Sequence, residues 1–64
     1  MNHPKSSPLA LLADATHVLL TAHQFGQDTR HALSEWQAAN GKLTDFDMTR
    51  VVTEFFRRLR QSLS

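Results

Sequence analysis

The clearest hydrophobic pattern lies in the last third of the chain, residues 43–63. Its large apolar side chains fall within an arc of about 140° when each residue advances by roughly 100°, as in an α-helix. Thr44 is a good N-cap, Asp47 completes a pair similar to a capping box, and Leu43 precedes the cap, where it can pack onto Met48. We therefore predict an amphipathic helix over about 45–63. Its apolar face comprises Met48, Val51, Val52, Phe55, Phe56, Leu59 and Leu63.

A second pattern runs through the preceding part of the chain. From Leu11 to Ala39, apolar or small residues recur at alternating intervals of four and three positions, which is the spacing of a heptad seam. Pro8 is favoured at the first position of a helix, and Asn40-Gly41 is typical of a helix end. The pattern predicts a long helix over about 8–39.

Gly26 lies in the middle of this predicted helix and leaves two alternatives open. The seam passes through Gly26 without losing register, which favours a continuous helix at a cost of about 1 kcal/mol relative to alanine. Alternatively, Gly26 terminates a shorter helix and Asp28 caps the start of the next. A break at Gly26 gives a three-helix bundle and weakens the need for a partner.

The two predicted helices give an all-α antiparallel helical hairpin, because the connection around residues 40–43 is short. Residues 8–64 form a single domain in this interpretation, and residues 1–7 a flexible arm. The first helix is much longer than the second, so a monomeric hairpin leaves its leucine-rich half uncovered. We therefore expect two hairpins to assemble as a homodimeric four-helix bundle.

Composition and charge restrict the function without identifying it. A chain of 64 residues without cysteine builds a small core and has no disulfide to stabilise it, which again favours oligomerisation. The longest apolar run, residues 9–20, is too short to cross a bilayer, so we expect a soluble, cytoplasmic protein. The formal net charge is only +1, and the basic residues concentrate in the last helix.

Few residues suggest catalysis or metal binding. Asp14 and His17, like Asp28 and His31, have the spacing of paired ligands on a helix, but the last helix offers no histidine to face them. The chain has no cysteine nucleophile and no glycine-rich phosphate loop, and a short helical chain rarely encloses a pocket. We expect no enzyme activity, no metal and no cofactor. A membrane-surface role for residues 44–63 is less favoured than packing on protein.

Nucleic-acid binding is the alternative function that the sequence allows. Clustered arginines on one helix provide the charge that phosphate contacts need. Glu54 lies among them, four residues from Arg50 and from Arg58, as in a solvated, salt-bridged face. A helix-turn-helix fits poorly, because Gly41 then occupies a position that needs a buried apolar residue. The candidate contact residues are Arg50, Arg57, Arg58 and Arg60.

The leading hypothesis is a small protein-protein interaction module, such as an adaptor, regulator or chaperone-like protein. Its partners are a second copy of the chain, a larger protein, or both. The hypothesis follows from an excess of apolar helix surface over what a hairpin with unequal arms can bury. Trp36 is a candidate anchor at the interface, although its place on the seam favours the core. The candidate interface residues are Leu9, Leu12, Leu19, Leu20, Trp36, Phe55, Phe56 and Leu59.

Overall fold

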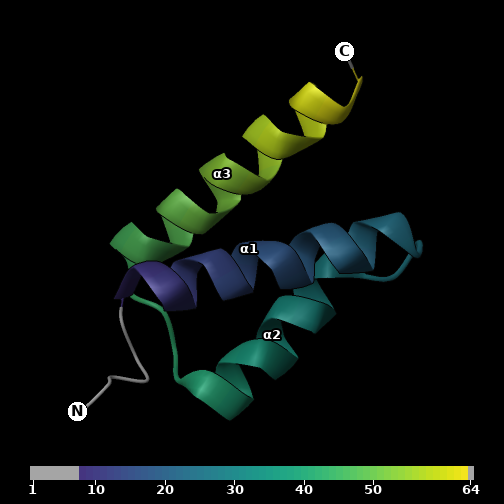
Figure 1. The fold of residues 1–64 in the computed structure, drawn as a ribbon. Coiled ribbons are helices and arrows are strands. Elements are labelled where there is room, and N and C mark those ends of the chain that lie inside the picture. Colours follow the sequence, from purple (N-terminus) through teal and green to yellow (C-terminus); the bar gives the residue numbers. More distant parts are fainter. Residues whose placement is uncertain (1–7, 64) are drawn as a thin grey trace, which may run out of the picture.

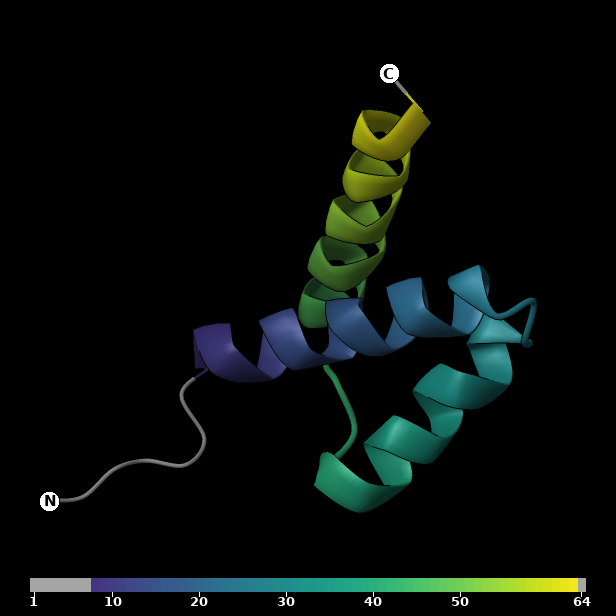
Figure 2. The same ribbon diagram turned by 45° about the vertical axis from the view of Figure 1, so that its right-hand side comes forward.

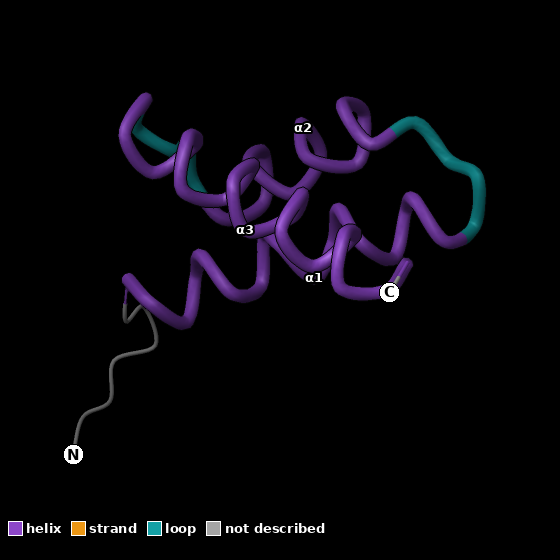
Figure 3. The backbone as a smooth tube through the Cα atoms, turned by 90° about the horizontal axis from the view of Figure 1, so that it is seen from above, coloured by secondary structure: helices purple, strands orange, loops and turns teal. Residues whose placement is uncertain are grey.

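The computed structural model describes residues 8–63, which form three helices and no strand (Figure 1, Figure 3). Helix α1 spans Pro8–Gln24, α2 spans Thr29–Asn40 and α3 spans Asp45–Leu63. The all-α class and the bounds of the last helix are confirmed. The flexible arm predicted for residues 1–7 lies outside the described residues.

The continuous helix predicted over residues 8–39 is wrong, and the break at Gly26 is what the chain adopts. Gly26 has a φ of +69°, in the left-handed region that terminates helices. Its N–H donates to the carbonyl of His23 at 3.1 Å, and the N–H of Gln27 donates to the carbonyl of Ala22 at 2.8 Å. This pair of bonds is the Schellman motif, which satisfies the last carbonyls of α1. The heptad register through Gly26 therefore does not reflect a shared helix.

Both ends of α2 are fixed by the residues that the sequence indicates. The Asp28 side chain accepts hydrogen bonds from the N–H groups of Arg30 at 2.9 Å and His31 at 3.4 Å, so it caps the first turn. Gly41, with a φ of +110°, ends the helix and donates its N–H to the Gln37 carbonyl at 2.8 Å. The predicted restart at Asp28 and the predicted stop at Gly41 are both confirmed.

The start of α3 follows the predicted cap. The hydroxyl of Thr44 accepts a hydrogen bond from the N–H of Asp47 at 3.1 Å. Leu43 and Met48, one on each side of the cap, both pack against the core. The N–H of Leu43 also donates to the side-chain oxygen of Gln37 at 2.8 Å, which ties the connection to α2. The connection that leads into α3 is therefore held by the cap at Thr44 and by the hydrogen bond from Leu43 to α2.

The core is centred on α1, and α2 and α3 each pack against it rather than along each other (Figure 1). Alanines at positions 15 and 22, two turns apart on α1, are almost completely buried and allow the neighbouring helices a close approach. The second view shows α3 rising steeply away from α1, so that its C-terminal half extends beyond the rest of the fold (Figure 2). The buried apolar residues are Ala15, Leu19, Ala22, Leu33, Trp36, Val51 and Phe55.

Polar groups at the edge of this core have hydrogen-bond partners. The indole N–H of Trp36 donates to a carboxylate oxygen of Asp14 at 2.7 Å, which joins α2 to α1. Thr16 is buried, and its hydroxyl donates to the Leu12 carbonyl within the same helix at 2.8 Å. The small core is thus closed by packing and by one side-chain hydrogen bond between helices.

Candidate protein-interaction surface

An apolar row remains accessible along α3, beside the face that is buried on α1. Val51 and Phe55 point into the core, with 1% and 7% of their surface exposed. The adjoining row is spaced four, three and four residues apart, so it follows one side of the helix. We call this row the α3 stripe. It consists of Val52, Phe56, Leu59 and Leu63.

Exposure alternates along the α3 stripe and is greatest at its C-terminal end. Val52 and Leu59 are half-buried, whereas Phe56 is 55% and Leu63 87% exposed. The high exposure of Leu63 follows from the fold, since α3 leaves α1 as it rises (Figure 2). The phenyl ring of Phe56 leans on that of Phe55, with ring centroids 5.3 Å apart. The buried ring of Phe55 therefore restricts the orientation of the exposed ring of Phe56, so Phe56 loses less conformational freedom when a partner binds.

A hollow lies beside each half of the α3 stripe. The first, of about 270 Å³, separates α2 from α3. Leu19 and Leu33 contribute apolar walls to it, Val52 and Phe56 belong to the α3 stripe, and Arg30 contributes a basic group. The second, of about 360 Å³, lies between the C-terminal ends of α1 and α3. Its lining comprises Leu20, His23, Gln24, Leu59, Ser62 and Leu63.

The structure distributes the predicted interface residues between core and surface. Leu19, Trp36 and Phe55 are core residues. Leu12, Leu20 and Leu59 are half-buried and pack against the core. Leu9 and Phe56 are the strongly exposed members of the set, at 69% and 55%. Phe56 and Leu59 lie together on the α3 stripe. Leu9 lies at the N-terminal end of α1 and is not part of the stripe.

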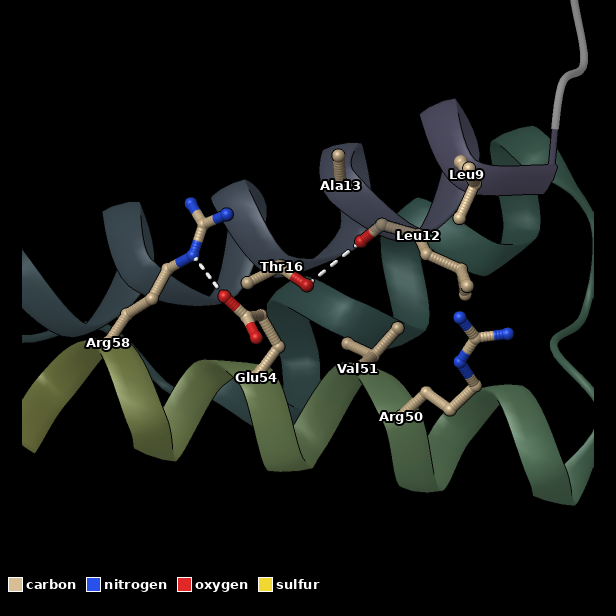
Figure 4. Close-up of a pocket in the computed structure, with 8 residues that line it drawn as sticks. All are labelled: Leu9, Leu12, Ala13, Thr16, Arg50, Val51, Glu54 and Arg58. Atoms are coloured by element: carbon tan, nitrogen blue, oxygen red, sulfur yellow. Dashed lines mark hydrogen bonds and ion pairs between the residues drawn. The ribbon is translucent and has the colours of Figure 1, made fainter.

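Leu9 borders a third hollow, of about 220 Å³, between α1 and α3 (Figure 4). Its lining mixes leucines from α1 with charged side chains from α3. Figure 4 shows Arg58 bonded to Glu54 at one end and Arg50 directed towards Leu12 at the other. This mixture of charged and apolar groups differs from the apolar lining along the α3 stripe.

The four candidate nucleic-acid residues are only partly available as a cationic cluster. Glu54 accepts two hydrogen bonds from Arg57, both at 3.0 Å, and one from Arg58 at 2.8 Å. These bonds, with that of Arg57 the largest cause, lower the pKa of the Glu54 carboxyl to about 2 and raise the pKa of Arg57. Arg50 lies over the ring of Phe46, 5.6 Å from its centroid, and Arg60 is exposed. The salt-bridged face that the sequence indicates is present, but Glu54 pairs with Arg57 and Arg58 while Arg50 stacks on Phe46.

The histidines and aspartates considered as metal ligands have separate local partners. His31 pairs with Glu35 at 3.2 Å on the exposed side of α2, and His17 lies 3.5 Å from the Thr21 hydroxyl. His23 packs edge-on against Phe55, with ring centroids 6.1 Å apart. Within residues 8–63 there is no group of three or more potential ligands that could hold a metal ion. None of the helices in that range is both long and apolar enough to cross a membrane.

Sequence reasoning missed part of this surface. The pattern places Leu63 on the apolar face of the last helix but does not single it out as an interface residue, although it is the most exposed large apolar side chain of the described chain. Phe25 and Phe46 are 72% and 70% exposed, and Phe25 falls on the seam between Leu11 and Ala39. The overhang of α3, which leaves Leu63 uncovered, depends on where α1 ends and has no local signal in the sequence.

Comparison with protein-family models, curated proteins and solved structures finds no match to this chain. The function must therefore be argued from the geometry of its own residues. Among the surfaces described above, the α3 stripe combines exposed Phe56 and Leu63 with two hollows whose linings contain no carboxylate.

Proposed function

We propose that this chain is a small, non-enzymatic protein-protein interaction module that binds a partner helix along the α3 stripe. The single observation that supports this most strongly is the exposure of Phe56 and Leu63 on a row with a hollow beside each of its halves. Apolar helix faces of this kind dock against the apolar face of another helix, with side chains spaced three and four residues apart as anchors. The binding surface is fixed by the fold and does not depend on a continuous first helix.

The size of the core supports the same proposal. Only eight of the described residues are buried, and one of them is a threonine. A domain this small gains little from its own core and commonly gains stability by association. The break at Gly26 lets α2 cover part of α1, which reduces the uncovered leucine surface upstream. This arrangement leaves the α3 stripe accessible. We therefore expect a partner to bind the last helix rather than the first.

The absence of enzymatic activity is also part of the proposal. The side chains best suited to catalysis already have structural partners, since Asp14 accepts from Trp36 and Asp28 caps α2. The pairing of His31 with Glu35 lies on an exposed helix face. Nucleophilic or acid-base catalysis requires such groups to converge on a bound substrate.

A matched pair of phenylalanines on α3 provides the test. Phe56 is on the α3 stripe, whereas Phe46 is more exposed but lies on the other side of the helix. Tagged wild-type, Phe56→Ser and Phe46→Ser chains are expressed in the source organism, and the co-purifying proteins are quantified, including untagged copies of the chain. We expect Phe56→Ser to lose partners that Phe46→Ser keeps. The proposal is refuted if all three chains retain the same proteins in the same amounts.

Nucleic-acid binding through α3 remains the second candidate, and the charge pairing weakens it. Phosphate groups must compete with the Glu54 carboxylate for Arg57 and Arg58. A heparin or duplex-DNA column measures this directly. Retention at low salt that is lost in an Arg57→Glu, Arg58→Glu variant would favour nucleic acid over protein as the partner.

A further inference from the structure

We infer that the occupant of the α3 stripe is a second copy of this chain, with the two α3 helices packed antiparallel about a twofold axis. The inference rests on the proposed function and specifies its partner. It is carried by the spacing of the stripe, the shape of the fold and the position of Arg30.

The spacing of the α3 stripe makes it self-complementary in the antiparallel orientation. Intervals of four, three and four residues read the same in both directions. A twofold axis between Arg57 and Arg58 brings Val52 opposite Leu63 of the second copy and Phe56 opposite Leu59 of the second copy. Every residue of the stripe then meets an apolar residue, and the same patch serves both subunits, as in an isologous interface.

The shape of the fold favours the antiparallel orientation. Helix α1 crosses the N-terminal half of α3, α2 lies on the other side of α1, and the C-terminal half of α3 projects beyond both (Figure 2). A parallel pair would bring both sets of α1 and α2 to the same end and would leave the two projecting half-helices in contact only with each other. In the antiparallel pair the two sets lie at opposite ends, and each projecting half-helix reaches the hollow between α2 and α3 of the other copy.

The charge at that hollow suits the end of a helix. Arg30 lines it together with Val52 and Phe56, and no carboxylate does. In the antiparallel pair, this hollow receives the last turns of the second α3, around its Leu63. Carbonyl groups at the C-terminal end of a helix carry partial negative charge and are stabilised by a nearby cation. Arg30 therefore complements the carbonyl groups at the C-terminal end of the partner helix, whose last turn also carries the basic side chain of Arg60.

The first measurement is the mass in solution at high micromolar concentration. We expect twice the chain mass of 7.3 kDa, falling towards one chain on dilution. Phe56→Ser should raise the dissociation constant by about 30-fold or more, the loss typical of a central interface residue. Phe46→Ser should leave it unchanged. Far-ultraviolet circular dichroism and the fluorescence of Trp36 establish that each variant is folded.

The second measurement fixes the orientation by disulfide formation, since the chain has no cysteine of its own. Val52→Cys and Leu63→Cys chains are oxidised separately and as a mixture. In the antiparallel pair the two positions are opposite each other, while two copies of Leu63→Cys have their thiols about 16 Å apart along the axis. A disulfide needs Cα atoms within about 7 Å. We expect the mixture to cross-link at least about tenfold faster than either variant alone.

The outcomes separate this inference from the proposed function. A mass of one chain at high micromolar concentration overturns the inference. If Phe56→Ser still loses partners in the source organism that Phe46→Ser keeps, the proposed function stands with a different partner. If Leu63→Cys alone cross-links as fast as the mixture, the antiparallel arrangement is wrong. If the chain is monomeric and Phe56→Ser loses no partner, both are overturned.

Discussion

Replacing Gly26 with alanine tests the turn that gives this chain three helices instead of two. Gly26 has a φ of +69°, and a Cβ atom built on it meets no other atom within 4 Å. The substitution therefore introduces no clash, and its effect on stability comes from the backbone alone. This separates the conformational preference of one residue from packing.

The expected magnitude follows from two opposing terms. A left-handed backbone conformation costs an alanine about 1–2 kcal/mol relative to glycine. The smaller conformational freedom of alanine in the unfolded chain returns about 0.4–1 kcal/mol. The net expectation is a loss of about 1 kcal/mol in the free energy of unfolding. In an uninterrupted helix over residues 8–39, the same substitution would instead add about 1 kcal/mol. The three-helix fold and the uninterrupted helix therefore predict opposite signs for the change in the free energy of unfolding.

Urea denaturation followed by the fluorescence of Trp36, the single tryptophan, measures this difference. All variants are compared at one protein concentration, because association changes apparent stability. Gly26→Asn should fall between glycine and alanine, since asparagine tolerates the left-handed region better. Ala13→Gly, at an exposed position in the interior of α1, should lose about 1 kcal/mol and measures the cost of glycine in a helix of this protein. If alanine stabilises the protein and ranks above asparagine, the turn at Gly26 is wrong.

Two further predictions concern side-chain hydrogen bonds. Asp14→Ala removes the acceptor of the Trp36 indole N–H and should lower the free energy of unfolding, measured by chemical denaturation, by about 1–2 kcal/mol. Asp14→Asn keeps an acceptor oxygen and should lose less. Equal losses in the two variants would show that this hydrogen bond does not stabilise the fold. The pKa of Glu54 is about 2, below its ordinary value of 4.5, so its stabilising pairs are intact above about pH 4.5 and are lost as the pH falls towards 2. The thermal midpoint of the wild type should therefore exceed that of Glu54→Gln at pH 7, and the two midpoints should converge as the pH falls towards 2. If the difference between the midpoints stays constant over this pH range, Glu54 does not stabilise the fold through its charge.

Local signals in the sequence account for most of the secondary structure. Thr44 with Asp47, Asp28, and Asn40-Gly41 each mark a helix end, because capping depends on side-chain and backbone groups only a few residues apart. The salt-bridged face around Glu54 was predictable for the same reason, since residues three and four apart on a helix are neighbours. These features require no knowledge of the rest of the fold.

The error at Gly26 shows where periodicity misleads. The intervals of four and three continue through the turn, yet Phe25 is 72% exposed and Leu33 faces the core from α2. A seam of small residues is compatible with one helix or with two that are joined by a turn. The choice depends on whether α2 gains more by packing Trp36 and Leu33 onto α1 than by extending it, which is a balance of tertiary contacts.

By itself, the sequence determined the all-α class, the helix ends outside the turn at Gly26 and the amphipathic character of the last helix, because these arise from interactions between residues close in the chain. Only the tertiary structure decided which apolar residues are buried and which remain on the surface. Phe55 and Phe56 are adjacent and chemically identical, and α1 covers the first while leaving the second half-exposed. The crossing of α3 over α1, and the overhang that leaves Leu63 accessible, follow from how three helices share one small core. The α3 stripe is therefore a property of the packed fold that helical periodicity alone does not specify.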